Sequence, residues 1–190
     1  FSKARRPTMR IFEPHAHMIS RTVDDYEKMA VAGIEVIVEP SFWLGEPRKY
    51  AGTFFDYYDH ISNFEPTRAA NHGIRHFCLI SVNPREANNR PLAEAVLKEL
   101  PRFLDRPGVL GVGEIGFDDI TDAEEDALRR QILLARERDL PVMIHTPHRR
   151  KREGTERTIR ILKEMGCDPA KVLMDHNTEE SIEMSLAGGF

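Results

Sequence analysis

Residues 10–17 read Arg-Ile-Phe-Glu-Pro-His-Ala-His, a short apolar run that ends in the pair His15 and His17. Two side chains spaced i, i+2 on an extended strand point to the same face. Two neutral imidazoles on one face can hold a single divalent cation. A His-x-His pair on its own is more often a pair of surface or packing histidines. Its meaning therefore depends on what the other predicted strands carry at their ends.

Apolar, β-branched stretches alternate with helical patterns along the rest of the chain. Strands are expected at 10–15, 34–38, 74–82, 109–116, 142–145 and 172–174. Strict alternation of such strands with helices is typical of a parallel sheet. No glycine-rich dinucleotide fingerprint follows the first strand, where the histidine pair stands instead. We therefore predict an α/β fold of the (β/α)8 TIM-barrel type, with about six of its β/α units in this chain.

Three threonines mark expected helix starts. Thr22, followed by Asp25, and Thr121, followed by Glu124, have the spacing of a capping box. Thr155 stands before a further helical pattern and is expected to begin that helix.

Composition limits the class of protein. With 190 residues, 41% of them hydrophobic and 31% charged, the chain suits one globular domain. We predict a basic N-terminal arm over 1–9 and one barrel domain over 10–190, incomplete at its C-terminus. The net charge of −4 is not that of a dedicated nucleic-acid binder.

Two further features concern location. No apolar run reaches the length of a membrane span, and the N-terminus lacks the apolar region of a signal peptide. Cys78 and Cys167 are isolated and fit no motif, which indicates reduced thiols. A cytoplasmic protein without membrane partners is the expectation.

Metal-ligand residues stand at the ends of four predicted strands. His15 and His17 follow the first, Glu114 lies in the fourth, His145 ends the fifth and His176 follows the sixth. Glu114 is the hardest to explain otherwise, because an unpaired carboxylate is expensive to bury in an apolar strand. Four histidines and a glutamate at one barrel mouth suffice for a two-metal site with a bridging carboxylate.

Four motifs carry a resemblance to a known family. They are Pro-His-Ala-His at 14–17, Gly-Glu-Ile-Gly-Phe-Asp at 113–118, Pro-Val-Met-Ile-His-Thr at 141–146 and Asp-His at 175–176. In this order they resemble the TatD-like metal-dependent hydrolases, which implies an amidohydrolase-like TIM barrel.

The resemblance also implies two divalent metal ions (zinc, manganese or magnesium) and a ligand for each position. By it, His15 and His17 bind the first ion, Glu114 bridges, and His145 and His176 bind the second. The family's last ligand, an aspartate after strand eight, has no counterpart before residue 190.

The expected chemistry is hydrolysis by metal-activated water, with the ions stabilising the oxyanion that develops. Glu114 is the candidate catalytic residue and contributes charge. His148, Arg149 and Arg150 are candidate substrate-binding residues, because arginines bind phosphate in bidentate fashion. A solvated run of charges ahead of a helix is an equally good interpretation. Asp118 is a candidate for orienting a ligand histidine.

Three functions remain open from the sequence. The first is a DNase-like hydrolase of phosphodiesters, with a nucleotide or nucleic acid as substrate, which the basic loop motivates. The second is a small-molecule amide or lactone hydrolase on the same metal site, which the acidic net charge motivates. The third is a non-catalytic metal-binding fragment, motivated by the absent aspartate.

Overall fold

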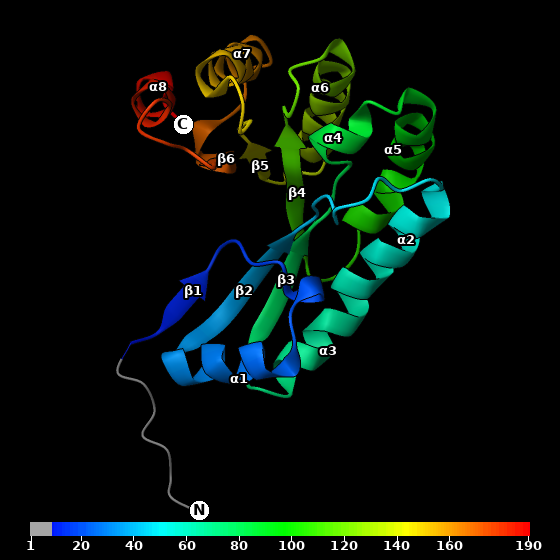
Figure 1. Cartoon of the computed structure of the whole chain (residues 1–190), viewed down its shortest axis with the longest axis vertical. Helices are drawn as coiled ribbons and strands as arrows, with labels where there is room; N and C mark the ends of the chain where they lie inside the picture. The colour runs from blue at the N-terminus through cyan, green and yellow to red at the C-terminus, as the bar shows by residue number, and fades with distance from the viewer. Residues whose placement is uncertain (1–8) are drawn as a thin grey trace, which may run out of the picture.

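The computed structural model describes residues 9–190, so that of the predicted basic arm 1–9 only Met9 lies within it. Six strands form one sheet in the order of the chain, and every neighbouring pair is parallel. The strands are β1 (Ile11–Glu13), β2 (Ile34–Pro40), β3 (Arg75–Leu79), β4 (Val109–Gly116), β5 (Val142–His145) and β6 (Val172–Asp175). The sheet curves as a half-barrel (Figure 1), which confirms the predicted fold class.

Helices follow the strands and pack on the outer side of the curved sheet (Figure 1). They are α1 (Val23–Ala32), α2 (Ala51–Asp59), α3 (Glu65–Ala70), α4 (Pro84–Ala87), α5 (Arg90–Leu104), α6 (Asp122–Glu137), α7 (Lys151–Glu164) and α8 (Ile182–Gly188). Short 3-10 turns lie at η1 (Met18–Ser20) and η3 (Pro169–Lys171), and a π-helical turn, η2 (His60–Phe64), joins α2 to α3. None of the described helices is long and apolar enough to cross a membrane.

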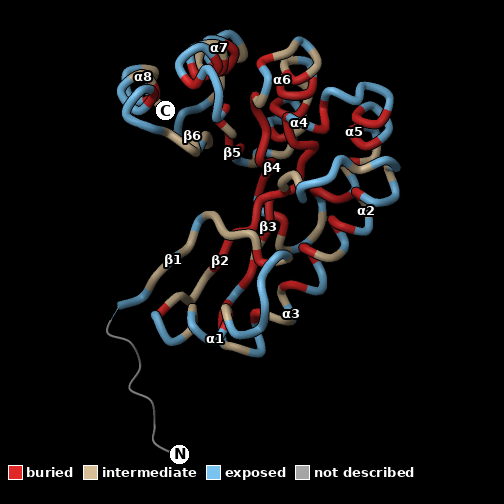
Figure 2. Tube along the Cα trace, in the orientation of Figure 1, coloured by how far each residue is buried: buried red, intermediate tan, exposed pale blue. Residues whose placement is uncertain are grey.

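The hydrophobic core lies between the sheet and these helices, and the buried segments follow β2 to β5 in Figure 2. Leu100 and Phe103 of α5 are fully buried in it, together with Ile115 of β4. A separate and much smaller buried cluster consists of Val38, Leu79 and Met143. Most of the apolar burial, which drives folding, therefore fixes helices to the outside of the barrel and leaves its mouth free for polar groups.

Glycine is required in β4 where the next strand approaches closely. A Cβ atom on Gly111 would lie 2.5 Å from the carbonyl oxygen of Pro141, well inside van der Waals contact. The absence of a side chain there lets β4 and β5 pair and brings the end of β4 beside that of β5.

β1 and β6 are the two edge strands of the sheet. Among residues 9–190, each of them pairs with one neighbouring strand only. Phe12 of β1 and Leu173 of β6 are 59% and 46% exposed. This arrangement agrees with the prediction of about six units of a barrel.

The predicted limits of β4 and β5 are confirmed, and Thr121 forms the predicted capping box with Glu124. Thr22 stands directly before α1, as predicted, but its side chain makes no capping hydrogen bond, so the capping box is not formed there. One other helix start was wrong. Thr155 lies inside α7, which begins four residues earlier at Lys151, because the side chain of that lysine is anchored in the barrel mouth.

Candidate metal centre

His15 and His17 follow β1 rather than lying on it, since that strand ends at Glu13. The segment nevertheless stays extended beside β2, because the backbone N–H of Ala16 donates to the carbonyl of Val38 at 3.1 Å. The two imidazoles therefore keep the orientation expected of i, i+2 residues, and their Nε2 atoms lie 2.9 Å apart. The ring of His17 is also stacked on Phe42 with 3.7 Å between the ring centroids.

Glu114 lies at the centre of the cluster and is 5% exposed. Its Oε1 is 3.1 Å from Nε2 of His176 and 3.3 Å from Nε2 of His15. Its other oxygen, Oε2, is 3.8 Å from Nδ1 of His145. The structure thus brings together all five predicted metal ligands, from four different strand ends.

The charge states follow from burial and from these neighbours. Burial lowers the pKa of His17 to about 4, so its imidazole is neutral at pH 7 and keeps a lone pair for a cation. Burial acts to raise the pKa of Glu114, but the imidazoles of His145, His176 and His15 outweigh it and hold that pKa well below the ordinary value. The centre therefore presents a buried carboxylate surrounded by imidazoles.

Asp175 belongs to the same cluster, although the sequence analysis did not select it. Its Oδ2 accepts a hydrogen bond from Nδ1 of His15, and its Oδ1 accepts the backbone N–H of His176 at 2.7 Å. Although burial favours the neutral acid, these bonds keep the pKa of Asp175 below its usual value. Because Nδ1 of His15 is bonded to this carboxylate, the Nε2 atom of the ring faces the centre of the cluster. Histidines that bind metals are commonly oriented by a carboxylate in this way. The adjacent sequence Asp-His was the signal that could have pointed to it.

His176 is held through its backbone. Its φ is 55°, a left-handed conformation that residues other than glycine seldom adopt. The carbonyl oxygen of His176 accepts hydrogen bonds from Oγ1 of Thr146 at 3.0 Å and from Nζ of Lys151 at 2.7 Å. Nζ of the buried Lys151 also donates to the carbonyl and the hydroxyl oxygen of Thr146. We call this arrangement of Thr146, Lys151 and the His176 carbonyl the backbone clamp.

The side chains present fit a divalent metal. Ligand atoms of His15, Glu114, Asp175 and His176 lie within 4.8 Å of one another. Nδ1 of His17 and Nδ1 of His145 are buried and have no hydrogen-bond partner in the part of the chain that the structure describes. Imidazole nitrogens and carboxylate oxygens form the donor set of zinc and related ions.

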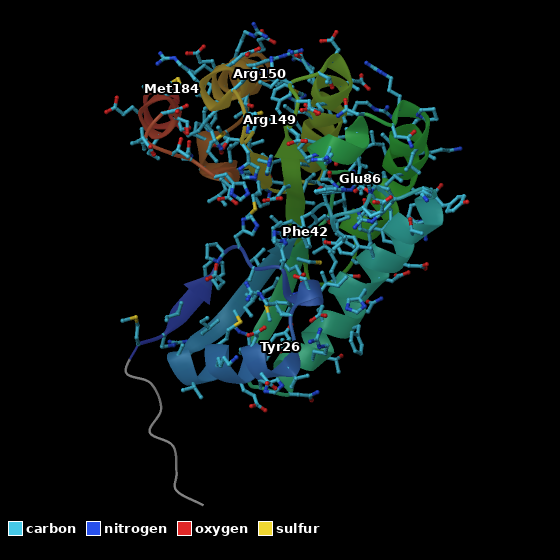
Figure 3. The ribbon with its side chains drawn as sticks, in the orientation of Figure 1. Tyr26, Phe42, Glu86, Arg149, Arg150 and Met184 are labelled. Carbon is cyan, nitrogen blue, oxygen red and sulfur yellow. The ribbon has the colours of Figure 1, made fainter. Side chains whose placement is uncertain are left out.

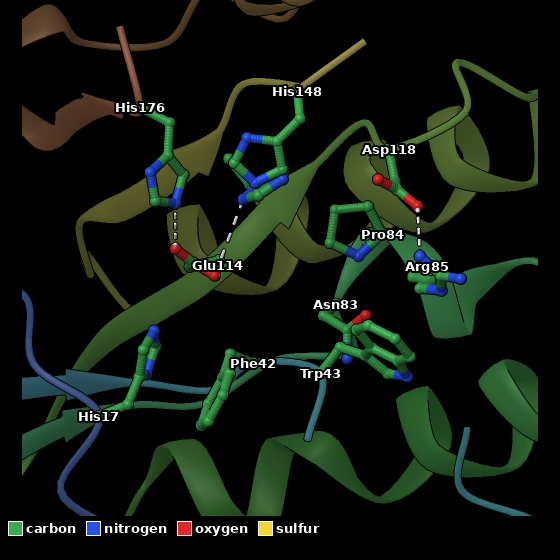
Figure 4. Close-up of a pocket in the computed structure, with 11 residues that line it drawn as sticks. His17, Phe42, Trp43, Asn83, Pro84, Arg85, Glu114, Asp118, His148 and His176 are labelled. Atoms are coloured by element: carbon green, nitrogen blue, oxygen red, sulfur yellow. Dashed lines mark hydrogen bonds and ion pairs between the residues drawn. The ribbon is translucent and has the colours of Figure 1, made fainter. Parts of the chain in front are cut away.

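A pocket with a volume of about 320 Å³ opens over this cluster. Figure 4 shows His17, Glu114 and His176 on one side of it and Trp43, Arg85 and Asp118 on the other. His148 also lines the pocket, as predicted for a substrate-binding residue. Asp118 faces Arg85 at 3.6 Å.

Arg149 and Arg150 are not among the residues that line this pocket. Both lie in the loop ahead of α7 (Figure 3), where Arg149 pairs with the Asp119 carboxylate at 2.5 Å. Arg150 donates to the Asp119 carbonyl and to Glu153. These contacts hold both guanidinium groups beside Asp119, outside the pocket.

A parallel half-barrel with histidines and carboxylates gathered at the C-terminal ends of its strands defines a metal-dependent hydrolase of the TIM-barrel type. Residues 14–187 match the family model of the TatD related DNases. The chain belongs to this family.

Individual relatives agree with the family. An uncharacterized metal-dependent hydrolase of Methanocaldococcus jannaschii is 30% identical over 177 residues, which cover 92% of this chain and 68% of the relative. The crystal structure of a TatD-like protein from Archaeoglobus fulgidus superposes with a TM-score of 0.83 at 27% identity, covering 93% of this chain and 73% of that one.

The fold extends to a more distant enzyme. A phosphotriesterase-like lactonase from Deinococcus radiodurans has a TM-score of 0.65 at 15% identity, covering 96% of this chain and 65% of its own. At that identity the likeness concerns the fold alone.

Proposed function

We propose that this chain cleaves phosphodiester bonds in the manner of a DNase, with a nucleotide or nucleic acid as its substrate. The observation that carries the proposal is the convergence of His15, His17, His145 and His176 on the buried Glu114 at one side of a pocket. The description of the matched family as DNases supports the phosphodiester over other esters.

The proposed roles are those that the resemblance to the family implies. His15 and His17 would hold one divalent ion, His145 and His176 would hold a second, and the carboxylate of Glu114 would be the ligand shared by both and the catalytic residue. When bound, such ions supply a nucleophilic water at neutral pH and stabilise the charge that develops on the phosphoryl oxygens. Zinc, manganese and magnesium are the candidates.

The chain's own groups orient these ligands and the substrate. Asp175 keeps the Nδ1 proton on His15 so that its Nε2 remains an acceptor. Burial, followed by the nearby charges of His145 and His176, lowers the pKa of His148. At neutral pH His148 therefore contacts the substrate as a neutral hydrogen-bonding group.

The substrate roles of Arg149 and Arg150 remain part of the proposal. Their side chains are 72% and 56% exposed outside the pocket. Arg149 and Arg150 would contact only a substrate that extends beyond the pocket. Their contact with its phosphates would be an attraction between charges more than a bidentate hydrogen bond.

A small-molecule amide or lactone hydrolase is the second candidate. The pocket is about 320 Å³, the lower end of the range for small-molecule sites, and Phe42, Trp43 and Pro84 give it an apolar side. The net charge of −4 also favours a substrate other than a long polyanion. The same metal chemistry would act on a carbonyl carbon.

We also propose a cytoplasmic location. Cys78 and Cys167 are both free thiols, and Cys78 is buried. Unpaired cysteines are typical of proteins in a reducing compartment.

The test compares substrates on one preparation loaded with Mn²⁺. The wild-type chain should release product from a short oligonucleotide. His15→Ala should reduce the rate of that reaction by at least about a hundredfold, because loss of a ligand weakens the binding of the metal ion. Turnover of a lactone panel with none of the oligonucleotide would instead support the second candidate. An unchanged rate in His15→Ala would contradict both.

A further inference from the structure

The side of the pocket opposite Glu114 contains an arginine stacked on an indole. Arg85, in α4, places its guanidinium carbon 4.0 Å from the ring centre of Trp43. Asp118 approaches the guanidinium at 3.6 Å, which is an ion pair but not a hydrogen bond. Arg85 is the only lysine or arginine among the described residues that line the pocket (Figure 4).

The hydrogen-bond donors of Arg85 are unused. Its side chain makes no hydrogen bond to any residue from 9 to 190, whereas Arg149 and Arg150 are bonded to Asp119 and Glu153. Nε1 of Trp43, a hydrogen-bond donor, is also buried without a hydrogen-bond partner among the described residues. Oδ2 of Asp118 accepts no hydrogen bond there either and is paired with Arg85 by charge alone. This side of the pocket therefore has polar groups whose hydrogen-bonding capacity is not met within the described chain.

We propose that the guanidinium of Arg85, stacked on Trp43, and the indole N–H of Trp43 form a subsite for a second anionic group of the substrate, beyond the phosphodiester that is cleaved. The natural occupant is a terminal phosphate one nucleotide away from the scissile bond. The inference rests on the proposed phosphodiesterase function and deepens it, since it assigns a preference for phosphorylated ends.

The chemistry of each group supports this role. A guanidinium presents a planar fork of N–H donors that matches the oxygens of a phosphate, and stacking on an aromatic ring restricts the plane of that fork. Asp118 lies 3.6 Å from the guanidinium and accepts no hydrogen bond from it, so the N–H donors of Arg85 remain available to a phosphate. Arg85 is half exposed, so a phosphate can reach it from solvent without crossing the metal centre.

The experiment uses two thymidine dinucleotides that differ in one group, dTpdT and its 5′-phosphorylated form pdTpdT. Each is hydrolysed by the wild-type chain loaded with Mn²⁺, and kcat and KM are measured separately. The KM of pdTpdT should be about tenfold lower than that of dTpdT, the effect of one charged hydrogen-bonded pair. Arg85→Ala should abolish this difference by raising the KM of pdTpdT to that of dTpdT measured on the same variant.

Arg102→Ala is the matched control. That arginine is also stacked on an aromatic ring, 4.3 Å from the centre of Phe103, and is paired with Glu99, but it does not line the pocket. Arg102→Ala should keep the preference for pdTpdT, and Arg85→Lys should keep part of it, since it retains the charge and loses the fork.

Equal KM values for the two dinucleotides in the wild-type chain would overturn the subsite and leave the proposed function standing. A lower KM for pdTpdT than for dTpdT that persists in Arg85→Ala would also overturn the subsite and leave the proposed function standing. If neither dinucleotide is hydrolysed, the proposed function fails and the subsite fails with it.

Discussion

The carbonyl oxygen of His176 accepts hydrogen bonds from the side chains of two residues, Thr146 and Lys151. A left-handed backbone costs a residue such as histidine about 1–3 kcal/mol, so the surrounding bonds must hold it. Oγ1 of Thr146 also lies 2.7 Å from the carbonyl of Asp175. The backbone clamp therefore determines where the imidazole of His176 stands.

Thr146 offers a sharp test of this clamp. Thr146→Val keeps the shape and removes the hydroxyl, and it should weaken metal binding by about tenfold, as changes behind metal ligands do. Thr146→Ser keeps the hydroxyl and should bind metal as the wild type does. The measurement is the dissociation constant of Zn²⁺ by competition with a chromophoric chelator.

Thermal unfolding of the metal-free variants separates positioning from general stability. If Thr146→Val unfolds at a lower temperature yet binds Zn²⁺ as tightly as Thr146→Ser, the clamp stabilises the fold without positioning His176.

Residue types and strand ends were enough to predict that histidines gather around Glu114. Glu114 was informative because a carboxylate in an apolar strand requires a partner, and its partners are histidines. Asp175 and Lys151 were missed because their roles depend on contacts with residues far along the chain. Nor does the sequence show that Asp119 pairs with Arg149.

Among the elements, those whose signals are local were predicted best. The capping box of Thr121 and the apolar runs of β4 and β5 depend on neighbouring residues and were found at the right positions. The start of α7 depends on the contact of Lys151 with the barrel mouth, so Thr155 was a misleading signal. Tertiary contacts override local signals at such helix ends.

Glu65, at the start of α3, ties three elements together. Its carboxylate accepts hydrogen bonds from Tyr26 of α1 and Arg68 of α3, and it contacts His60 of η2 at 2.9 Å. Burial acts to raise the pKa of Glu65, but these partners outweigh it and lower the pKa below the ordinary value. The ionised carboxylate is therefore more stable in the folded chain than in the unfolded one.

Glu65→Gln should lower the free energy of unfolding at pH 7 by about 1–3 kcal/mol, because it removes a charged acceptor from buried donors. A lowered pKa gives stabilisation that is present above the unfolded value of about 4.3 and is lost as the pH falls through the folded value. The difference in the free energy of unfolding between Glu65→Gln and the wild type should therefore be smaller at acid pH than at pH 7. Urea unfolding at pH 7 and at pH 3.5 measures it, and a difference independent of pH would contradict this account.

The whole molecule is a parallel half-barrel in which each strand contributes to one mouth. The outer helices carry most of the apolar core, and the mouth carries the histidines and acids. β1 and β6 lie at opposite edges of the sheet, and the curvature of the sheet (Figure 1) brings His15 and Asp175 together across the mouth. The fold class could be predicted since strict alternation and parallel pairing leave few arrangements.

We propose that this mouth binds two divalent ions that share Glu114 as a ligand. Elemental analysis of the metal content per chain tests this on the wild type and on Glu114→Gln after equal exposure to Zn²⁺ and dialysis. About two ions per wild-type chain are expected, and a clear loss in the variant, because the shared charge is removed. Circular dichroism shows whether the variant is folded. The two-ion site is contradicted if the folded wild-type chain retains no ion. It is also contradicted if Glu114→Gln retains as many ions as the wild type.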